Sequence, residues 1–239
     1  MTTVVISQPL LFPWPGFFEL FATADIYVHL DDVQFADKSF TNRIQLKLPT
    51  RPTWMTIPVR DRSARNLICD IEASDEPWRR KHRELIRHSL AKAPHLDDAL
   101  SLFDLSYARQ KLIDLLIESV ELPAKYLGVF SSQQTLKSSS LGIKTAGSQR
   151  ILDIVRHVGG TRYVTAHGAA NYLDHESFSS TKIAVEYVDY SLTPYPQLHG
   201  AFTPYVSVLD LVANMGQAGG TVIRPKTIPW KDFLARRNA

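Results

Sequence analysis

The sequence is poor in cysteine, with Cys69 alone among 239 residues, so no intrachain disulfide can form. A chain of this kind fits a reducing compartment. Cys69 lies in the apolar segment Leu67–Ile71, where a cysteine usually behaves as a small buried hydrophobe. We therefore expect neither a disulfide scaffold nor a reactive thiol.

Long hydrophobic runs are also missing. No stretch of about eighteen apolar residues is present, and no basic segment followed by an apolar one opens the chain. The sequence therefore predicts a cytoplasmic protein with no membrane span.

An excess of charge of one sign is absent as well, since the formal net charge is +3 at pH 7. The densest basic segment, Arg79–Arg83, lies between Glu76 and Glu84. Mixed charge of this kind is typical of a solvated helix face. Nucleic acid is not an expected partner, whereas a small anionic ligand is compatible with the composition.

Three motifs of familiar enzyme classes do not occur: GxSxG, GxGxxG and the P-loop. Their absence argues against an α/β-hydrolase nucleophile elbow, a Rossmann dinucleotide site and a Walker nucleotide site. The eight histidines do not have the cysteine or carboxylate spacing of a zinc site. No metal site is predicted.

What is present at the start is an alternation of strand and helix signals. Val4–Ser7 is an apolar strand, Gly16–Ala24 has apolar residues at helical spacing, and Ile26–Leu30 is a second strand. Because a helix joins the two strands, we expect them to be parallel.

A hairpin is predicted next. Arg43–Leu48 and Trp54–Val59 alternate in polarity on either side of the turn-rich Pro49–Pro52, which favours an antiparallel pair. Leu67–Ile71 is a candidate addition to that pair.

The middle third of the chain is predicted to be helical. Residues 76–126 have helical periodicity in two or three segments, with breaks near Ala93–Pro94 and Pro123, and we expect them to pack on the sheet. The polar stretch Ser131–Ser140 is interpreted as a loop.

The last third returns to α/β order, with a helix at Ser148–Val158 and strands at Arg162–Thr165 and Ile183–Tyr187. Tyr205–Met215 is apolar nearly all round, which indicates a buried helix. The predicted fold class is α/β: a single domain with a mostly parallel central sheet, a β-hairpin extension and a helical insertion.

Short patterns of unusual composition are spread over nearly the whole chain. They comprise QP-x-x-φ-PW-x-G-x-F at 8–18, AD-x-φ-V-x-LD-x-VQF at 24–35 and the pair Asn42–Arg43. Further positions follow: Trp54, Pro58, Trp78, Tyr163, Gly168, Tyr172, Leu173, Tyr195, Gln197, Phe202, Ser207, Leu209, Asp210 and Asn214. Together they resemble the WbqC-like family of bacterial proteins. The resemblance departs at one position, because a histidine is expected where this chain has Ser7.

This resemblance implies an association with bacterial surface-polysaccharide and sugar-modification gene clusters. It suggests a transferase that modifies an amino sugar or related amine by acyl or aminoacyl transfer. The partner would be a small-molecule substrate, either a nucleotide-linked sugar or a carrier-bound acyl group. An ATP-dependent ligase or nucleotidylyltransferase-like enzyme using ATP and Mg²⁺ is the alternative, and a noncatalytic binding module is a third. No cofactor is identified.

The first candidate site is the Gln8–Gly16 loop, at the carboxyl end of a strand, where open α/β sheets bind ligands. Its prolines fix the path, and Gly16 would let N–H groups at the helix start face an anion. Gln8, Trp14 and Gly16 are thus candidate substrate-binding residues. Alternatively, Trp14 and the prolines only pack the loop.

Asp31 ends the second strand, next to Asp32. Adjacent strand residues point to opposite faces, and Asp31 is the one that the family pattern carries. It is a candidate catalytic residue, as a general base, an amine-binding group or a metal ligand. The alternative is a hydrogen-bond cap for the turn at Val33–Phe35.

Asn42 and Arg43 are candidate substrate-binding residues, since the arginine fork suits a carboxylate or phosphate. An ion pair of Arg43 with Asp31 or Asp37 is the alternative. The short connections predict one pocket lined by five residues: Trp14, Gly16, Asp31, Asn42 and Arg43.

Lys144, Ser148 and Arg150 open a helix and could bind a phosphate there, although Ser148 could equally be an ordinary cap. His167 follows the next strand and is a candidate proton carrier, with a structural role as the alternative. Asn171 and Tyr172, beside it, are candidate substrate-binding residues.

Ser207, Asp210 and Asn214 fall at i, i+3 and i+7 on the predicted buried helix. A buried carboxylate needs donors, so Asp210 is expected to contact either the Gln8–Gly16 loop or Asn42–Arg43, and to support the site from behind. Alternatively, Asp210 ties down residues 195–202.

Overall fold

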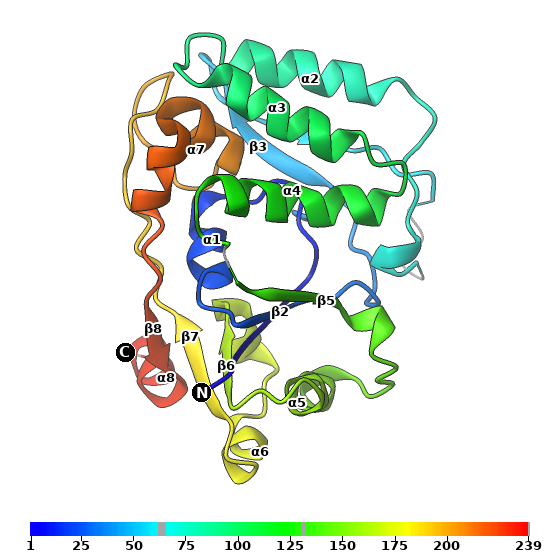
Figure 1. Ribbon diagram of the computed structural model, residues 1–239, viewed down its shortest axis with the longest axis vertical. Helices are drawn as coiled ribbons and strands as arrows, with labels where there is room; N and C mark the ends of the chain where they lie inside the picture. Colours follow the sequence, from blue (N-terminus) through cyan, green and yellow to red (C-terminus); the bar gives the residue numbers. More distant parts are fainter. Residues whose placement is uncertain (62–65, 131, 239) are drawn as a thin grey trace.

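The computed structural model describes residues 1–61, 66–130 and 132–238, and combines a central sheet with helices on both faces and a separate hairpin (Figure 1). The strands are β1 (Thr3–Ser7), β2 (Ile26–His29), β3 (Arg43–Lys47), β4 (Pro52–Thr56), β5 (Gln134–Lys137), β6 (Arg162–Thr165), β7 (Ala184–Val188) and β8 (Thr227–Pro229). The helices are α1 (Pro15–Phe21), α2 (Trp78–Ser89), α3 (Leu96–Tyr107), α4 (Leu112–Tyr126), α5 (Gly147–His157), α6 (His175–Ser180), α7 (Val208–Met215) and α8 (Trp230–Asn238).

The central sheet has the strand order β5-β2-β1-β6-β7-β8. All its pairs are parallel except β7 with β8. β3 and β4 form a separate antiparallel pair. The predicted α/β class, with a mostly parallel sheet and a hairpin extension, is confirmed.

Helices α1 and α5 cover opposite faces of the sheet. Val5 of β1 packs in one core cluster with Phe17 of α1, whereas Val4 packs in another with Ile154 of α5. Neighbouring strand residues point to opposite faces, so the two helices lie on different sides. The chain runs from β1 outward to β2 and later crosses to β6 on the other side of β1. The strand order therefore reverses between β1 and β6.

The helical insertion forms a layer at one end of the molecule, where α2, α3 and α4 lie beside α7 and the hairpin (Figure 1). Its core is continuous with the α1 face of the sheet. The insertion was predicted, but the expected break at Pro123 was wrong, because α4 continues through this residue to Tyr126. A proline so near the helix end removes only one backbone donor there.

Two other sequence interpretations were wrong. Leu67–Ile71 does not extend the hairpin: Ile68–Asp70 is a 3₁₀ turn, and only an isolated bridge joins Leu67 to Gln34. Within Ser131–Ser140, taken as a loop, Ser131 lies outside the described residues, Gln134–Lys137 is edge strand β5 and Ser138–Ser140 is a 3₁₀ turn.

No helix within the described ranges is long and apolar enough to cross a membrane.

Candidate functional site

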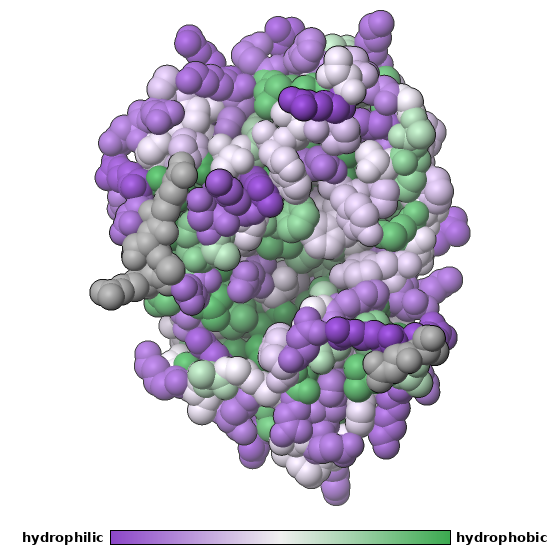
Figure 2. Space-filling model, turned by 180° about the vertical axis from the view of Figure 1, so that it is seen from behind, coloured by the Kyte–Doolittle hydropathy of each residue, from purple (hydrophilic) through white to green (hydrophobic). Residues whose placement is uncertain are grey.

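A cleft of about 420 Å³ lies where the strand order reverses, at the carboxyl ends of β1 and β6. Its polar lining comes from Ser7, Gln8, Thr165 and Tyr172, and the remaining lining is aliphatic or glycine. Figure 2 shows a face of the molecule that is hollowed across its middle, with apolar side chains inside the hollow and polar ones around it. Open α/β sheets bind ligands at such a reversal point.

The sequence builds this cleft from strand ends and small residues. β1 ends at Ser7 and β6 at Thr165, so both polar side chains reach the same edge of the sheet. Gly168 follows in a 3₁₀ turn, and a Cβ built on it would have no described atom within 4 Å. This part of the cleft wall therefore has open space in front of it.

The loop after β1 is held from two helices. The Phe12 N–H donates to Ser119 Oγ of α4 at 3.1 Å, and Ser207 Oγ donates to the Phe12 carbonyl at 3.0 Å. Phe12 has a positive φ of 34°, an unfavourable conformation for a residue with a side chain. Binding both of its backbone polar groups compensates for that strain and fixes the loop beside the cleft.

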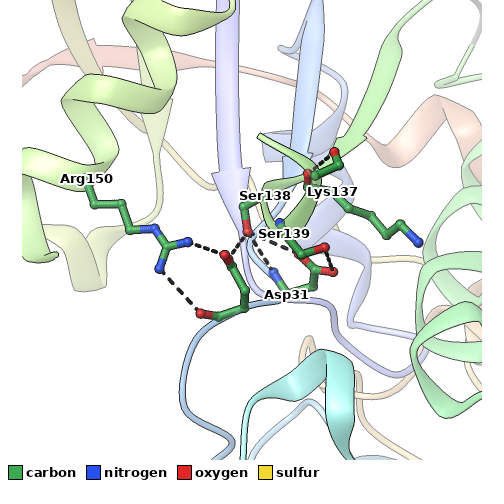
Figure 3. Close-up of polar contacts among 7 residues, drawn as sticks. Asp31, Lys137, Ser138, Ser139 and Arg150 are labelled. Atoms are coloured by element: carbon green, nitrogen blue, oxygen red, sulfur yellow. Dashed lines mark hydrogen bonds and ion pairs between the residues drawn. The ribbon is translucent and has the colours of Figure 1, made fainter. Parts of the chain in front are cut away.

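Asp31 is 1% exposed and lies in a network with the turn after β5 (Figure 3). Its Oδ1 accepts from the Ser139 N–H at 2.9 Å and from Ser138 Oγ at 3.1 Å, and its Oδ2 accepts from Ser139 Oγ at 2.7 Å. The Asp31 N–H in turn donates to Ser138 Oγ at 3.1 Å. The carboxylate thereby joins the ends of β2 and β5.

Asp32 takes the other direction, toward α5. Arg150 Nη2 lies 2.5 Å from Asp32 Oδ2, and the Ser138 hydroxyl also contacts Asp32. Burial raises the pKa of Asp32, but the hydrogen bonds from Ser138 and Arg150 outweigh it and hold this pKa below its usual value. Figure 3 shows the Arg150 side chain directed at Asp32 and Ser138 and the Lys137 side chain directed away from them.

Trp14 and Arg43 are connected by aromatic side chains and not through Asp31. The Trp14 ring lies 5.2 Å from Phe40, Phe40 lies 5.7 Å from Trp54, and the Arg43 guanidinium carbon stands 4.2 Å above the Trp54 ring. Among the described residues, Arg43 stacks on Trp54 and Asp31 is bound by Ser138 and Ser139, with no ion pair between Arg43 and Asp31. That the five residues line one pocket stays a prediction.

Gly16 packs closely against its neighbours, and Asn42 makes hydrogen bonds within the protein. A Cβ on Gly16 would lie 3.0 Å from the Trp14 Nε1 and 3.1 Å from Leu192, so the start of α1 is closed off from an anion. Asn42 Nδ2 donates to the Ile57 carbonyl at 3.2 Å and to Asp37 at 3.3 Å.

Of the three residues that open α5, Ser148 and Arg150 already have hydrogen-bond partners. Lys144 is exposed, and the Ser148 hydroxyl accepts from the Asp174 N–H at 2.8 Å, which links α5 to the start of α6. The cap position of α5 is Ala146, so capping by Ser148 was a wrong expectation. Arg150 is held by Asp32.

His167 lies at the rim of a second hollow of about 520 Å³, and Gly168 lines both this hollow and the cleft. The His167 Nε2 lies 2.8 Å from the Val188 carbonyl, which places a proton on that nitrogen and leaves Nδ1 as an acceptor. Asn171 accepts from Arg237 at 2.7 Å, whereas the Tyr172 ring lines the cleft.

The three polar residues predicted on one helix have separate partners. Ser207, the cap of α7, binds the Phe12 carbonyl, so this position does support the first loop. Asp210 instead accepts from the Tyr195 hydroxyl at 3.0 Å, as in the alternative interpretation. Burial raises the pKa of Asp210 to about 6. Asn214 donates to the backbone carbonyl of Asp210 at 2.8 Å.

Comparison with known protein families matches residues 8–221 to the WbqC-like protein family. The chain belongs to this family. A relative named "Uncharacterized protein Rv1507c", from Mycobacterium tuberculosis (strain ATCC 25618 / H37Rv), is 26% identical over 229 residues, which cover 94% of this chain and 98% of that protein. No solved structure matches the chain.

The WbqC-like match includes most of the cleft. Three cleft residues, Gln8, Gly168 and Tyr172, are also positions of the sequence patterns described above. Thr165 lies within the matched range but was not named as a site residue, because a threonine at the end of an apolar strand carries no distinctive signal. Ser138 and Ser139 were missed since their segment was interpreted as a loop.

Proposed function

We propose that this WbqC-like protein is a transferase that binds a nucleotide-linked amino sugar in the cleft between β1 and β6 and adds an acyl or aminoacyl group to its amine. The observation that carries the proposal is the position of the cleft at the reversal point of a mostly parallel sheet. The substrate class comes from the association with polysaccharide biosynthesis that the family resemblance implies.

The size and chemistry of the cleft support a small-molecule substrate. Its volume of about 420 Å³ is within the usual range of ligand pockets. Aliphatic walls offer apolar contact, while Gln8, Thr165 and Tyr172 offer a few hydrogen-bonding groups. Such a combination binds and orients a polar ligand.

Two of the proposed residues have different roles in this scheme. His167 lines the second hollow, which meets the cleft at Gly168, and its Nδ1 is an acceptor for an amine N–H on that side. The Asp31 carboxylate already accepts three hydrogen bonds from Ser138 and Ser139, which favours a positioning role at the end of β2. Proton transfer by Asp31 would first require breaking that network.

Thermal unfolding with a panel of ligands tests the proposal, because a ligand that binds only the native state raises Tm. Nucleotide-linked amino sugars with a free amine should raise Tm without added metal. Stabilisation by ATP alone, and only with Mg²⁺, would favour a ligase or nucleotidylyltransferase instead. Stabilisation without any transfer, with acyl thioesters or aminoacyl donors supplied, would indicate a binding module.

A matched pair of tyrosines assigns the binding to the cleft. Tyr172, 54% exposed, lines the cleft, whereas Tyr205, 53% exposed, lies outside its lining. We expect Tyr172→Ala and Gln8→Ala each to weaken binding about tenfold, which corresponds to ~1.4 kcal/mol. Tyr205→Ala should leave the dissociation constant unchanged. Equal effects of the two tyrosine variants would remove the cleft from the proposal.

A further inference from the structure

Ser7 and His29 are neighbours on one face of the sheet. The parallel register pairs Ser7 with His29 and Val5 with Tyr27. Side chains alternate along a strand, and both Val5 and Tyr27 pack in the core cluster on the α1 side. Ser7 and His29 therefore face that side together, at the carboxyl edge, where Ser7 also lines the cleft.

His29 is positioned by a carboxylate from α4. It is 1% exposed, and its Nε2 lies 3.4 Å from Glu121 Oε1, while Lys125 Nζ lies 3.7 Å from Glu121 Oε2. Burial raises the pKa of Glu121, but hydrogen bonds from His29 and Thr135 hold it below its usual value. An ionised Glu121 favours the His29 tautomer with its proton on Nε2, so that Nδ1 keeps a lone pair.

Two buried polar atoms beside Ser7 have no hydrogen-bond partner among the described residues: His29 Nδ1 and the Tyr27 hydroxyl. Their rings are 4.8 Å apart. Burial raises the pKa of Tyr27 and the Ser7 hydroxyl partly offsets this, while the strand register sets Ser7 beside His29. Buried polar atoms rarely lack partners, and a histidine nitrogen that can accept the proton of a neighbouring hydroxyl is the usual base for a nucleophile.

We propose that Ser7 is the nucleophile of a covalent acyl transfer, with His29 as its general base and Glu121 as the residue that positions the imidazole. The proposal rests on the proposed function and supplies its donor half, namely an acyl thioester or another activated ester. Ser7 Oγ donates to the Gln8 carbonyl at 3.3 Å in this structure. The proposed step requires a χ1 rotation that takes Ser7 Oγ from this carbonyl toward His29, and contacts between nucleophile and base are often loose before substrate binds.

The chemistry balances in two steps. Ser7 Oγ forms a bond to the acyl carbon as its proton moves to His29 Nδ1, and the carbon–sulfur bond of the donor breaks with return of that proton to the leaving thiolate. The amine then attacks the ester carbon, gives a proton to His29 Nδ1, and the bond to Ser7 Oγ breaks as the hydroxyl regains its proton. No oxidant, reductant or metal is consumed.

The first test uses p-nitrophenyl acetate as the acyl donor and peptide mass spectrometry as the readout. We expect a burst of p-nitrophenolate and an acetyl group on Ser7, both lost in Ser7→Ala and retained in Ser180→Ala, which changes an exposed serine of α6. In His29→Gln the acetylation of Ser7 should slow by about 100-fold, the low end for loss of a general base. Absence of acetyl-serine in the native chain, or equal rates with and without His29, would overturn the proposal.

A second test leaves the buried His29 unchanged, so it does not depend on whether a variant at position 29 folds. Ser7→Cys introduces a thiol beside His29, and Cys69 provides an internal reference, since burial raises its thiol pKa to about 11. Iodoacetamide should alkylate the introduced thiol at least tenfold faster than Cys69. Glu121→Gln should reduce that advantage while Tm changes little. An introduced thiol no more reactive than Cys69 would contradict the role of His29.

Failure of this proposal can be told apart from failure of the proposed function. A nucleotide-linked amino sugar that raises Tm without any acetylation of Ser7 would retain the transferase and exclude the covalent step. Acetylation of Ser7 without stabilisation by any such sugar would retain the nucleophile and exclude the substrate class.

Discussion

Asp31 and Asp210 are both buried carboxylates, 1% and 3% exposed, yet their surroundings differ. Asp31 accepts hydrogen bonds from two hydroxyls and a backbone N–H of the turn after β5. Asp210 accepts from the Tyr195 hydroxyl, and burial raises its pKa to about 6. The two sites differ in the number of donors at the carboxylate, and a buried charge with few donors is costly to keep.

The largest expected effect is at Asp31. Asp31→Ala removes the acceptor for Ser139 N–H and both serine hydroxyls, and it separates the ends of β2 and β5. We expect the free energy of unfolding to fall by about 3–5 kcal/mol, because three hydrogen bonds to a charged group, each worth about 1.5–3 kcal/mol, are lost together. Urea denaturation measures it, with the exposed Asp97→Ala as a control expected within about 0.5 kcal/mol. A loss at Asp31 no larger than at Asp97 would mean that the network adds nothing to stability.

Asp210 should produce the next largest effect, as a dependence on pH. Its folded pKa, about 6, lies above the ordinary value of 3.8 for an aspartate, so the native state holds the proton more tightly and loses stability as pH rises from about 4 to 6. This difference corresponds to roughly 2–3 kcal/mol. The native chain should therefore lose stability relative to Asp210→Asn over this range.

Urea titrations of both chains at pH 4, 5, 6 and 7 measure the difference, and contributions from other carboxylates cancel in it. A constant difference between the two chains across these pH values would refute the account of Asp210.

A smaller effect is expected when a single donor is removed from Asp31. Ser139→Ala deletes the hydroxyl that donates to Oδ2, and we expect a loss of about 1 kcal/mol because Ser139 is exposed and water can replace it. Ser140→Ala is the matched control, since its hydroxyl donates only to the Lys137 carbonyl on the surface. If both variants lose the same stability, the donor count is not what distinguishes Asp31.

Much of the sheet could be predicted from the sequence. β1, β2, β6 and β7 are short apolar segments flanked by helices or turns, and each was placed within about one residue. β5 was not predicted, because Gln134–Lys137 is a polar, half-buried strand at the sheet edge with no apolar run or clean alternation. β8 was likewise not predicted, as a three-residue strand gives too little pattern. The helix that follows it, α8, was not predicted either.

The residues of the cleft were also predicted only in part. Gln8 and Tyr172 line the cleft because the segments that follow parallel strands form the ligand-binding edge. Arg43 stacks on Trp54 and makes no ion pair with Asp31 among the described residues, since closeness in sequence does not tell in which direction a hairpin leaves the sheet. The partners of Asp31 lie 107 and 108 residues away, and their contact depends on the unpredicted β5.

The strand order also bears on how the chain folds during synthesis. β1 is completed at Ser7, but its second neighbour, β6, begins only at Arg162. Until the ribosome has made that segment, one edge of β1 has no strand beside it, and the loop after β1 also waits for Ser207. Contacts so distant along the chain form slowly, and an uncovered strand edge attracts other chains. A nascent chain that stalls before residue 162 would therefore expose its most apolar strand and depend on chaperones.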